Sequence, residues 1–204
     1  MRVDLGRCSL VFLGSWNPAI FQPDWVSRNI IRERNLVVEL QFGDVFAMRF
    51  RGAKISMVVG PTNVQISPDS INDDTLGCLE EVGLTILDKL PETPVRAFGV
   101  NFGFNLVGTA RAANELARLD PGNENFAGRP MAIRVQRGLP LNGGMLNISL
   151  ARVTEPLFHL DFNEHYPCPD GRARGARELL AGKTRAASGR ALGLARDLYG
   201  EALE

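Results

Sequence analysis

The pattern of apolar and polar residues along this chain predicts mainly β-strands. Short apolar or alternating runs are separated by turn residues such as Gly43-Asp44 and Gly60-Pro61. Such spacing is typical of strands that follow one another in an antiparallel meander. The expected strands cover 9–13, 36–42, 45–50, 55–59, 64–67, 95–107, 131–136, 145–153 and 157–165.

Apolar residues recur at helical spacing in four further segments. Asn72 can cap the second of them, whose first turn is acidic and which stops at Pro91. Glycines such as Gly182 weaken the last segment, so we expect a break within it. The segments are 23–34, 73–90, 109–119 and 173–203.

Together these elements predict an α+β protein with a meandering antiparallel sheet and helices. The order of a strand, a helix, further strands and a helix occurs twice along the chain. This order suggests two similar halves, 1–92 and 93–204, within one compact unit that spans 1–204. A chain of 204 residues is long enough to bury a sizeable core without disulfides.

The expected strand at 95–107 has one bulky face and one small face. Its even-numbered positions from Phe98 to Leu106 are aromatic or aliphatic, whereas its odd-numbered positions are Ala, Gly or Asn. In one interpretation the bulky face lies in the core and a helix or backbone presses on the small face. In the other, Asn101 and Asn105 are amides that line a ligand-binding groove.

Both histidines of the chain lie in the segment 157–165. In an extended strand, His159, Asp161, Asn163 and His165 share one face, with apolar residues on the other. A histidine two residues from an aspartate can contribute to a metal site or form a base with its orienting carboxylate, and Asn163 can bind a ligand. The same pattern is also typical of a strand whose polar face is in water.

The segment from Arg172 to Arg190 contains six basic residues and a single acid, Glu178, which gives it a local charge of +5. It can bind phosphate or nucleic acid, or it can be a solvated helix face whose charges balance acids elsewhere. The segment lacks aromatic residues for base stacking. Its basic residues are Arg172, Arg174, Arg177, Lys183, Arg185 and Arg190.

The composition of the chain narrows the choice of partners. Twenty-three basic and twenty-three acidic residues give no net charge, so any nucleic-acid binding would depend on a local patch. The three cysteines are far apart, and the N-terminal apolar run is too short for a signal peptide or a membrane span. We therefore expect a cytoplasmic protein. Gly182-Lys183-Thr184 lacks the earlier glycine that a phosphate-binding loop requires.

Three short motifs resemble a family of sporadically distributed bacterial proteins of about this length. They are an NPxxFxPxW-like motif at 17–25, a TPVxxxGxN-like motif at 93–101 and an NxHY-like motif at 163–166. The resemblance spans most of the chain, but the family has no assigned activity. No catalytic residue can therefore be transferred from it, and the cofactor stays unknown.

The sequence favours a non-enzymatic binding or assembly module that associates with itself or with another protein. Packing signals are frequent, whereas reactive groups that could converge on a substrate are rare. Two alternatives stay open: a small-molecule or metal-dependent hydrolase that uses His159, Asp161 and His165, and a nucleic-acid-binding protein that uses the basic C-terminal segment.

Overall fold

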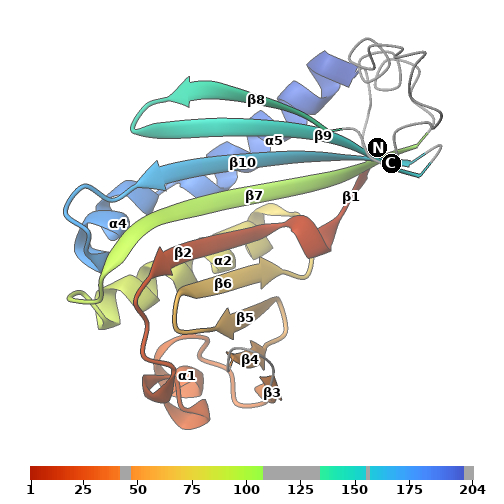
Figure 1. Ribbon diagram of the computed structural model, residues 1–204. Helices are drawn as coiled ribbons and strands as arrows, with labels where there is room; N and C mark the ends of the chain where they lie inside the picture. Colours follow the sequence, from red (N-terminus) through yellow and green to blue (C-terminus); the bar gives the residue numbers. More distant parts are fainter. Residues whose placement is uncertain (42–46, 108–133, 155–156, 200–204) are drawn as a thin grey trace, which may run out of the picture.

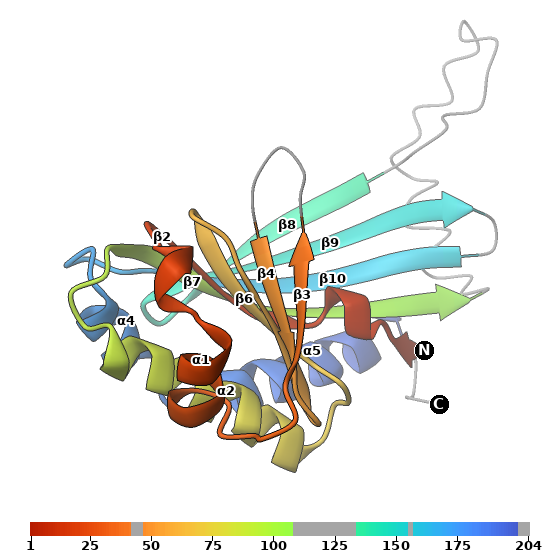
Figure 2. The ribbon, with the colours of Figure 1, turned by 90° about the horizontal axis from the view of Figure 1, so that it is seen from below.

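The computed structural model describes residues 1–41, 47–107, 134–154 and 157–199. In it, ten strands form one antiparallel sheet with helices packed on one face, which confirms the expected α+β class (Figure 1, Figure 2). The strands are β1 (Arg2–Val3), β2 (Ser9–Gly14), β3 (Val37–Gln41), β4 (Ala47–Arg51), β5 (Ile55–Val59), β6 (Asn63–Pro68), β7 (Val95–Val107), β8 (Arg134–Leu141), β9 (Gly144–Thr154) and β10 (Leu157–Pro167). The helices are α1 (Pro23–Asn29), α2 (Asp73–Lys89), α4 (Ala173–Leu180) and α5 (Lys183–Tyr199), with the 3-10 helices η1 (Leu5–Arg7) and η2 (Pro18–Ile20).

Strands β2 and β7 lie next to each other in the middle of the sheet. The strand order is β3-β4-β5-β6-β2-β7-β10-β9-β8, and the short β1 also pairs with β7. Strands β3 to β6, which come after β2 in the sequence, therefore lie on one side of this central pair. Strands β8 to β10, which come after β7 in the sequence, lie on the other side (Figure 1). The proposed duplication of two halves stays a prediction.

The core lies between the sheet and helices α2, α4 and α5 (Figure 2). Burial alternates along β10, as the period of two in a strand requires. The bulky face of the strand at 95–107 is the core face, and its Phe98 stacks on Tyr166 with the ring centroids 4.9 Å apart. The buried residues of β7 and β10 on this face include Phe98, Val100, Phe102, Phe104, Leu106, Phe158, Leu160, Phe162 and Tyr166.

Helix α2 begins where the sequence predicts, because the Asn72 side chain accepts a hydrogen bond from the Thr75 amide at 2.8 Å. Its Gly83 faces the sheet. A Cβ added there would come within 2.6 Å of the Leu10 side chain and 3.2 Å of Phe12. Glycine therefore allows the helix to lie directly on β2.

The end of one helix and the end of one strand differ by several residues from the expectation. Helix α1 ends at Asn29 rather than near residue 34, and Arg32 adopts a left-handed backbone conformation with a φ of 57°. Strand β8 continues to Leu141 through Gly138 and Pro140, rather than ending near residue 136. A proline is tolerated there because β8 is an edge strand whose outer side has no strand partner in the described chain.

The C-terminal helical segment contains the expected break. Helix α4 ends at Leu180, and Gly182 takes a φ of 76° before α5 begins, a conformation that glycine adopts without steric cost. The helix expected at 109–119 lies outside the described residues. No helix in the part of the chain that the structure describes is long and apolar enough to cross a membrane.

Candidate functional site

The sheet face opposite α2, α4 and α5, called here the polar face, carries polar side chains in rows that run across the strands. Residues paired directly across antiparallel strands lie on the same face, so the register defines each row. The histidine row contains Arg2, Asn105, His159, Ala151 and Arg134. The aspartate row contains Gly103, Asp161, Ser149 and Gln136. The asparagine row contains Ser9, Asn101, Asn163, Asn147 and Gly138.

The asparagine row forms a chain of hydrogen bonds across four strands. Asn147 donates to Asn163 at 3.2 Å, and Asn163 donates to Asn101 at 2.5 Å. Asn101 in turn donates to the Ser9 hydroxyl at 3.1 Å. Two of the three amides proposed as ligand-binding, Asn101 and Asn163, are therefore engaged with each other and with neighbouring strands, where they help to set the register.

An insertion between β1 and β2 places Arg7 over the polar face. Both strands pair with the same edge of β7, with Val3 opposite Phe104 and Ser9 opposite Asn101. Between these two pairs the N-terminal segment runs six residues, from Val3 to Ser9, whereas β7 runs only three, from Phe104 to Asn101. The extra residues of the N-terminal segment form η1. A Cβ at Gly103 would overlap the Arg7 side chain, so this glycine allows Arg7 to cross β7. The small face is thus crossed by Arg7, whereas the helices pack on the bulky face.

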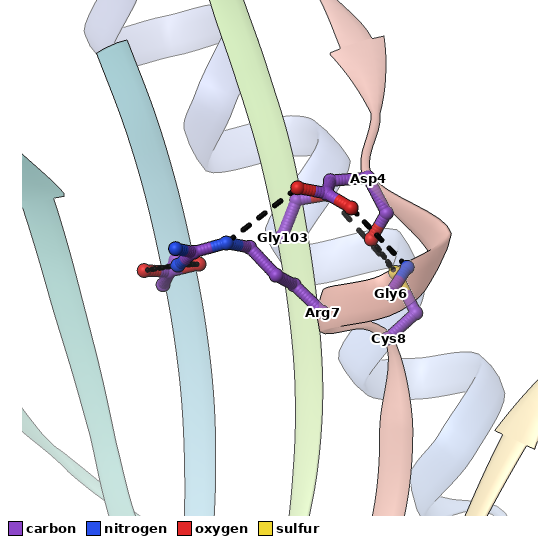
Figure 3. Close-up of polar contacts among 6 residues, drawn as sticks. Asp4, Gly6, Arg7, Cys8 and Gly103 are labelled. Atoms are coloured by element: carbon purple, nitrogen blue, oxygen red, sulfur yellow. Dashed lines mark hydrogen bonds and ion pairs between the residues drawn. The ribbon is translucent and has the colours of Figure 1, made fainter. Parts of the chain in front are cut away.

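Arg7 engages both carboxylate oxygens of Asp161. Its Nη1 donates to them at 2.9 and 2.7 Å, and its Nε lies 3.5 Å from an Asp4 oxygen (Figure 3). Beside them, burial raises the pKa of the Cys8 thiol to about 11, which keeps this thiol protonated and unreactive near neutral pH. Asp161 is therefore an ion-pair partner in this structure and makes no hydrogen bond to a histidine.

The histidine row and the adjacent Ser149 carry polar atoms without partners. Asn105 Oδ1, His159 Nδ1 and Ser149 Oγ are all shielded from solvent, and none has a hydrogen-bond partner among the described residues. They come from three adjacent strands, β7, β10 and β9. An unsatisfied buried polar group costs about 1–3 kcal/mol. Three in one place make this part of the polar face the strongest candidate for ligand binding.

The two histidines do not converge on one point. They lie on the same face of β10, as the sequence predicts, but six residues along a strand separate their Cα atoms by about 20 Å. In the described ranges, no group of three His, Cys, Asp or Glu side chains is arranged to hold a metal ion. The structure therefore brings His159 near Asp161, but it does not bring His165 to the same site.

Most basic side chains of the C-terminal segment contact other parts of the molecule. Arg172 pairs with Glu92 at 2.9 Å, and Arg177 pairs with Asp88 at the end of α2. The other contacts are Arg185 to the Asp73 carbonyl at 3.2 Å, Lys183 to the Tyr166 ring at 4.9 Å, and Arg190 to Glu164 at 2.7 Å. Arg174 is exposed, with no ion pair in the described part of the chain. The charge of +5 along the sequence is thus partly balanced by acids of other elements.

The amino terminus of α5 is occupied by a carboxylate of α2. Glu80 accepts hydrogen bonds from the Gly182 amide at 2.8 Å and from the Thr184 amide at 3.0 Å. It also accepts one from the Thr184 hydroxyl at 2.7 Å. A phosphate bound at a helix terminus would use these same donors. Gly182-Lys183-Thr184 therefore joins two helices and does not form a phosphate-binding loop.

A buried ion pair joins β10 to α5 on the core face. Glu164 is only 2 % exposed, and its oxygens accept hydrogen bonds from Arg190 at 2.7 and 2.8 Å. The Tyr166 hydroxyl donates to the same carboxylate at 2.6 Å. The pKa of Tyr166 is raised above its usual value, mainly because the hydroxyl is buried and secondly because it donates this hydrogen bond. The network is structural, because its position under α5 keeps it from the polar face.

The sequence did not single out Ser149, Arg134 or Arg7. The alternation in the strand at 145–153 places Ser149 on the polar face, but a lone serine is not a specific signal. Arg7 and Asp161 are 154 positions apart, so only the folded chain reveals their pairing.

No family model matches the chain, and no curated protein matches it. Its function is therefore inferred from its own residues. The two features that carry such an inference are the ends of the sheet and the unpaired polar atoms around His159.

Proposed function

We propose that the protein is a non-enzymatic assembly module that self-associates through the edge strand β3. The two edge strands of the sheet differ in how well their residues prevent pairing with a strand of another molecule. Edge strand β8 carries Arg134, Arg137 and Pro140, residue types that block edge-to-edge pairing. Edge strand β3 carries neither lysine nor proline, and its Val37 and Leu40 side chains are 54 % and 53 % exposed. This unprotected apolar edge is the observation that carries the proposal.

The charge on β3 does not oppose pairing between two copies. Its only charged residue, Glu39, lies 3.7 Å from Arg49 and 3.3 Å from Arg51 of the neighbouring β4. The whole chain has no net charge, so two copies approach each other without net repulsion.

A two-fold antiparallel pairing of β3 with β3 of a second copy extends the sheet across both molecules. With Val38 on the two-fold axis, Leu36 faces Leu40 of the second copy and Val37 faces Glu39. The alternative register, with Glu39 on the axis, places like charges opposite each other and is disfavoured. The first register therefore buries the exposed leucine in both copies.

The carboxylate that the hydrolase alternative requires is engaged elsewhere in the molecule. Asp161 binds Arg7, which supports the assembly proposal over a hydrolase that uses His159, Asp161 and His165. Three C-terminal arginines pair with acids, which supports it over nucleic-acid binding. Free thiols at Cys8, Cys78 and Cys168 fit a cytoplasmic location.

Sedimentation velocity over roughly a hundredfold range of protein concentration tests this proposal. We expect the wild type to shift from monomer to dimer as concentration rises, and Leu40→Lys to stay monomeric because its ammonium faces Leu36 of the second copy. Leu139→Lys is the matched control, since Leu139 is 42 % exposed on the protected edge β8. A monomeric wild type at all concentrations, or a dimer lost only in Leu139→Lys, contradicts the proposal.

A further inference from the structure

The histidine row contains a gap between two groups that can donate hydrogen bonds. Ala151 lies between His159 of β10 and Arg134 of β8 on the polar face. Alanine has no side-chain atom beyond Cβ, so no large side chain lies between His159 and Arg134 in this row. Arg134 is exposed, and no ion pair holds its guanidinium within the described residues.

Ser149 supplies a third donor beside this gap. It is two residues from Ala151 on the same face of β9, and its hydroxyl is shielded from solvent and unpaired. A guanidinium, a hydroxyl and an imidazole N–H around one small residue form a set of donors suited to an oxyanion. Asn105 Oδ1, on the far side of His159, is an unpaired acceptor.

We propose that this part of the polar face binds a small molecule that bears an oxyanion, a carboxylate or phosphate, and a nearby hydroxyl or amino group. The oxyanion lies over Ala151 and accepts hydrogen bonds from Arg134, Ser149 and His159. Because Ser149 Oγ, His159 Nδ1 and Asn105 Oδ1 are shielded from solvent in the free protein, these side chains rotate toward the ligand when it binds. The hydroxyl or amino group donates to Asn105 Oδ1. Asn105 and Arg134 are three strand spacings apart, about 14 Å between Cα atoms, which suits a compact metabolite rather than a polymer.

The nearby carboxylate does not exclude an anion. Asp161 is directly opposite Ser149, but both of its oxygens accept hydrogen bonds from Arg7. Arg7 therefore screens the one acidic side chain of the three rows from the bound oxyanion. The site lies on strands β7 to β8 and is separate from the edge β3, so binding does not depend on the proposed assembly.

The two histidines allow a direct test by nitrogen-detected NMR of the imidazole rings in the full chain. The probes are inorganic phosphate, acetate and glycolate, added at constant ionic strength maintained with sodium chloride. We expect His159 to shift saturably while His165, about 20 Å away on the same strand, does not. We also expect glycolate to bind more tightly than acetate, because its hydroxyl can donate to Asn105.

Two variants separate specific binding from general charge effects. Arg134→Gln should weaken binding by at least about tenfold, because it removes the charged donor. Arg137→Gln removes the same charge from the opposite face of β8 and should leave binding within about twofold. The proposal is overturned if no probe shifts His159 saturably, if His159 and His165 shift alike, or if the two variants behave alike.

Equal affinity for acetate and glycolate overturns the role of Asn105. Leu40→Lys should bind as the wild type does, so failure of the assembly proposal and failure of this one are distinguishable.

Discussion

The buried pair of Glu164 and Arg190 offers the sharpest test of how the C-terminal helix is held to the sheet. Replacing Arg190 by methionine keeps an apolar side chain of similar length but removes the guanidinium. Glu164, at 2 % exposure, then loses both hydrogen bonds from its cationic partner. Only the hydrogen bond from the Tyr166 hydroxyl remains.

The expected cost follows from the position of the carboxylate. Removing one partner of a buried ion pair typically lowers the free energy of unfolding by about 3–5 kcal/mol, because a charge is left without compensation. The Arg190 side chain is 40 % exposed, so water can reach its end of the pair. We therefore expect about 3 kcal/mol, at the low end of that range.

Guanidinium denaturation followed by the fluorescence of Trp16 and Trp25 measures this cost. The matched control is Arg172→Met, which removes the ion pair with Glu92 between side chains that are 62 % and 72 % exposed. Such a surface pair contributes at most about 1 kcal/mol. The double variant Glu164→Gln, Arg190→Met should recover most of the loss, since the buried charge is gone and the amide can still accept from Tyr166.

Two results would refute this reasoning. One is an Arg190→Met variant no less stable than Arg172→Met. The other is a double variant that is less stable than Arg190→Met alone, which would mean that the buried charge is not the source of the cost.

Two further predictions concern the N-terminal segment and the buried thiols. Gly103→Val should displace Arg7 from β7 and lower the melting temperature, because its Cβ would overlap Arg7 Cβ. In an Arg7→Gly background, which lacks that Cβ, the same substitution should cost clearly less, and an equal cost in both backgrounds would exclude the contact as the cause. Burial raises the pKa of the Cys8 and Cys168 thiols from 9.0 to about 11, so the folded state favours their protonated form. The stability that this provides is fully present below pH 9 and is lost as the pH rises through about 11, whereas a Cys8→Ala, Cys168→Ala variant should lose less over that interval. Equal pH dependence of the two proteins in thermal melts would count against buried thiols as the cause.

The sequence by itself determined the features that depend on local periodicity. The alternation from Val95 to Val107 identified both ends of β7 and its core face, because side chains alternate strictly along a strand. The same rule placed His159, Asp161 and His165 on one face of β10. Asn72 identified the start of α2, because a helix cap acts within one turn of the residues it serves.

Only the tertiary structure decided which of these local features meet. Arg7 reaches Asp161 because η1 inserts extra residues between two strands that pair with the same edge of β7. Arg134 shares a row with His159 because the registers of two further strand pairs place Ala151 between them. Strand registers and insertions depend on the packing of the whole sheet, and a shift by one residue would send each side chain to the other face. Periodicity therefore tells which residues share a face of a strand, whereas the partners across strands are set by the folded chain as a whole.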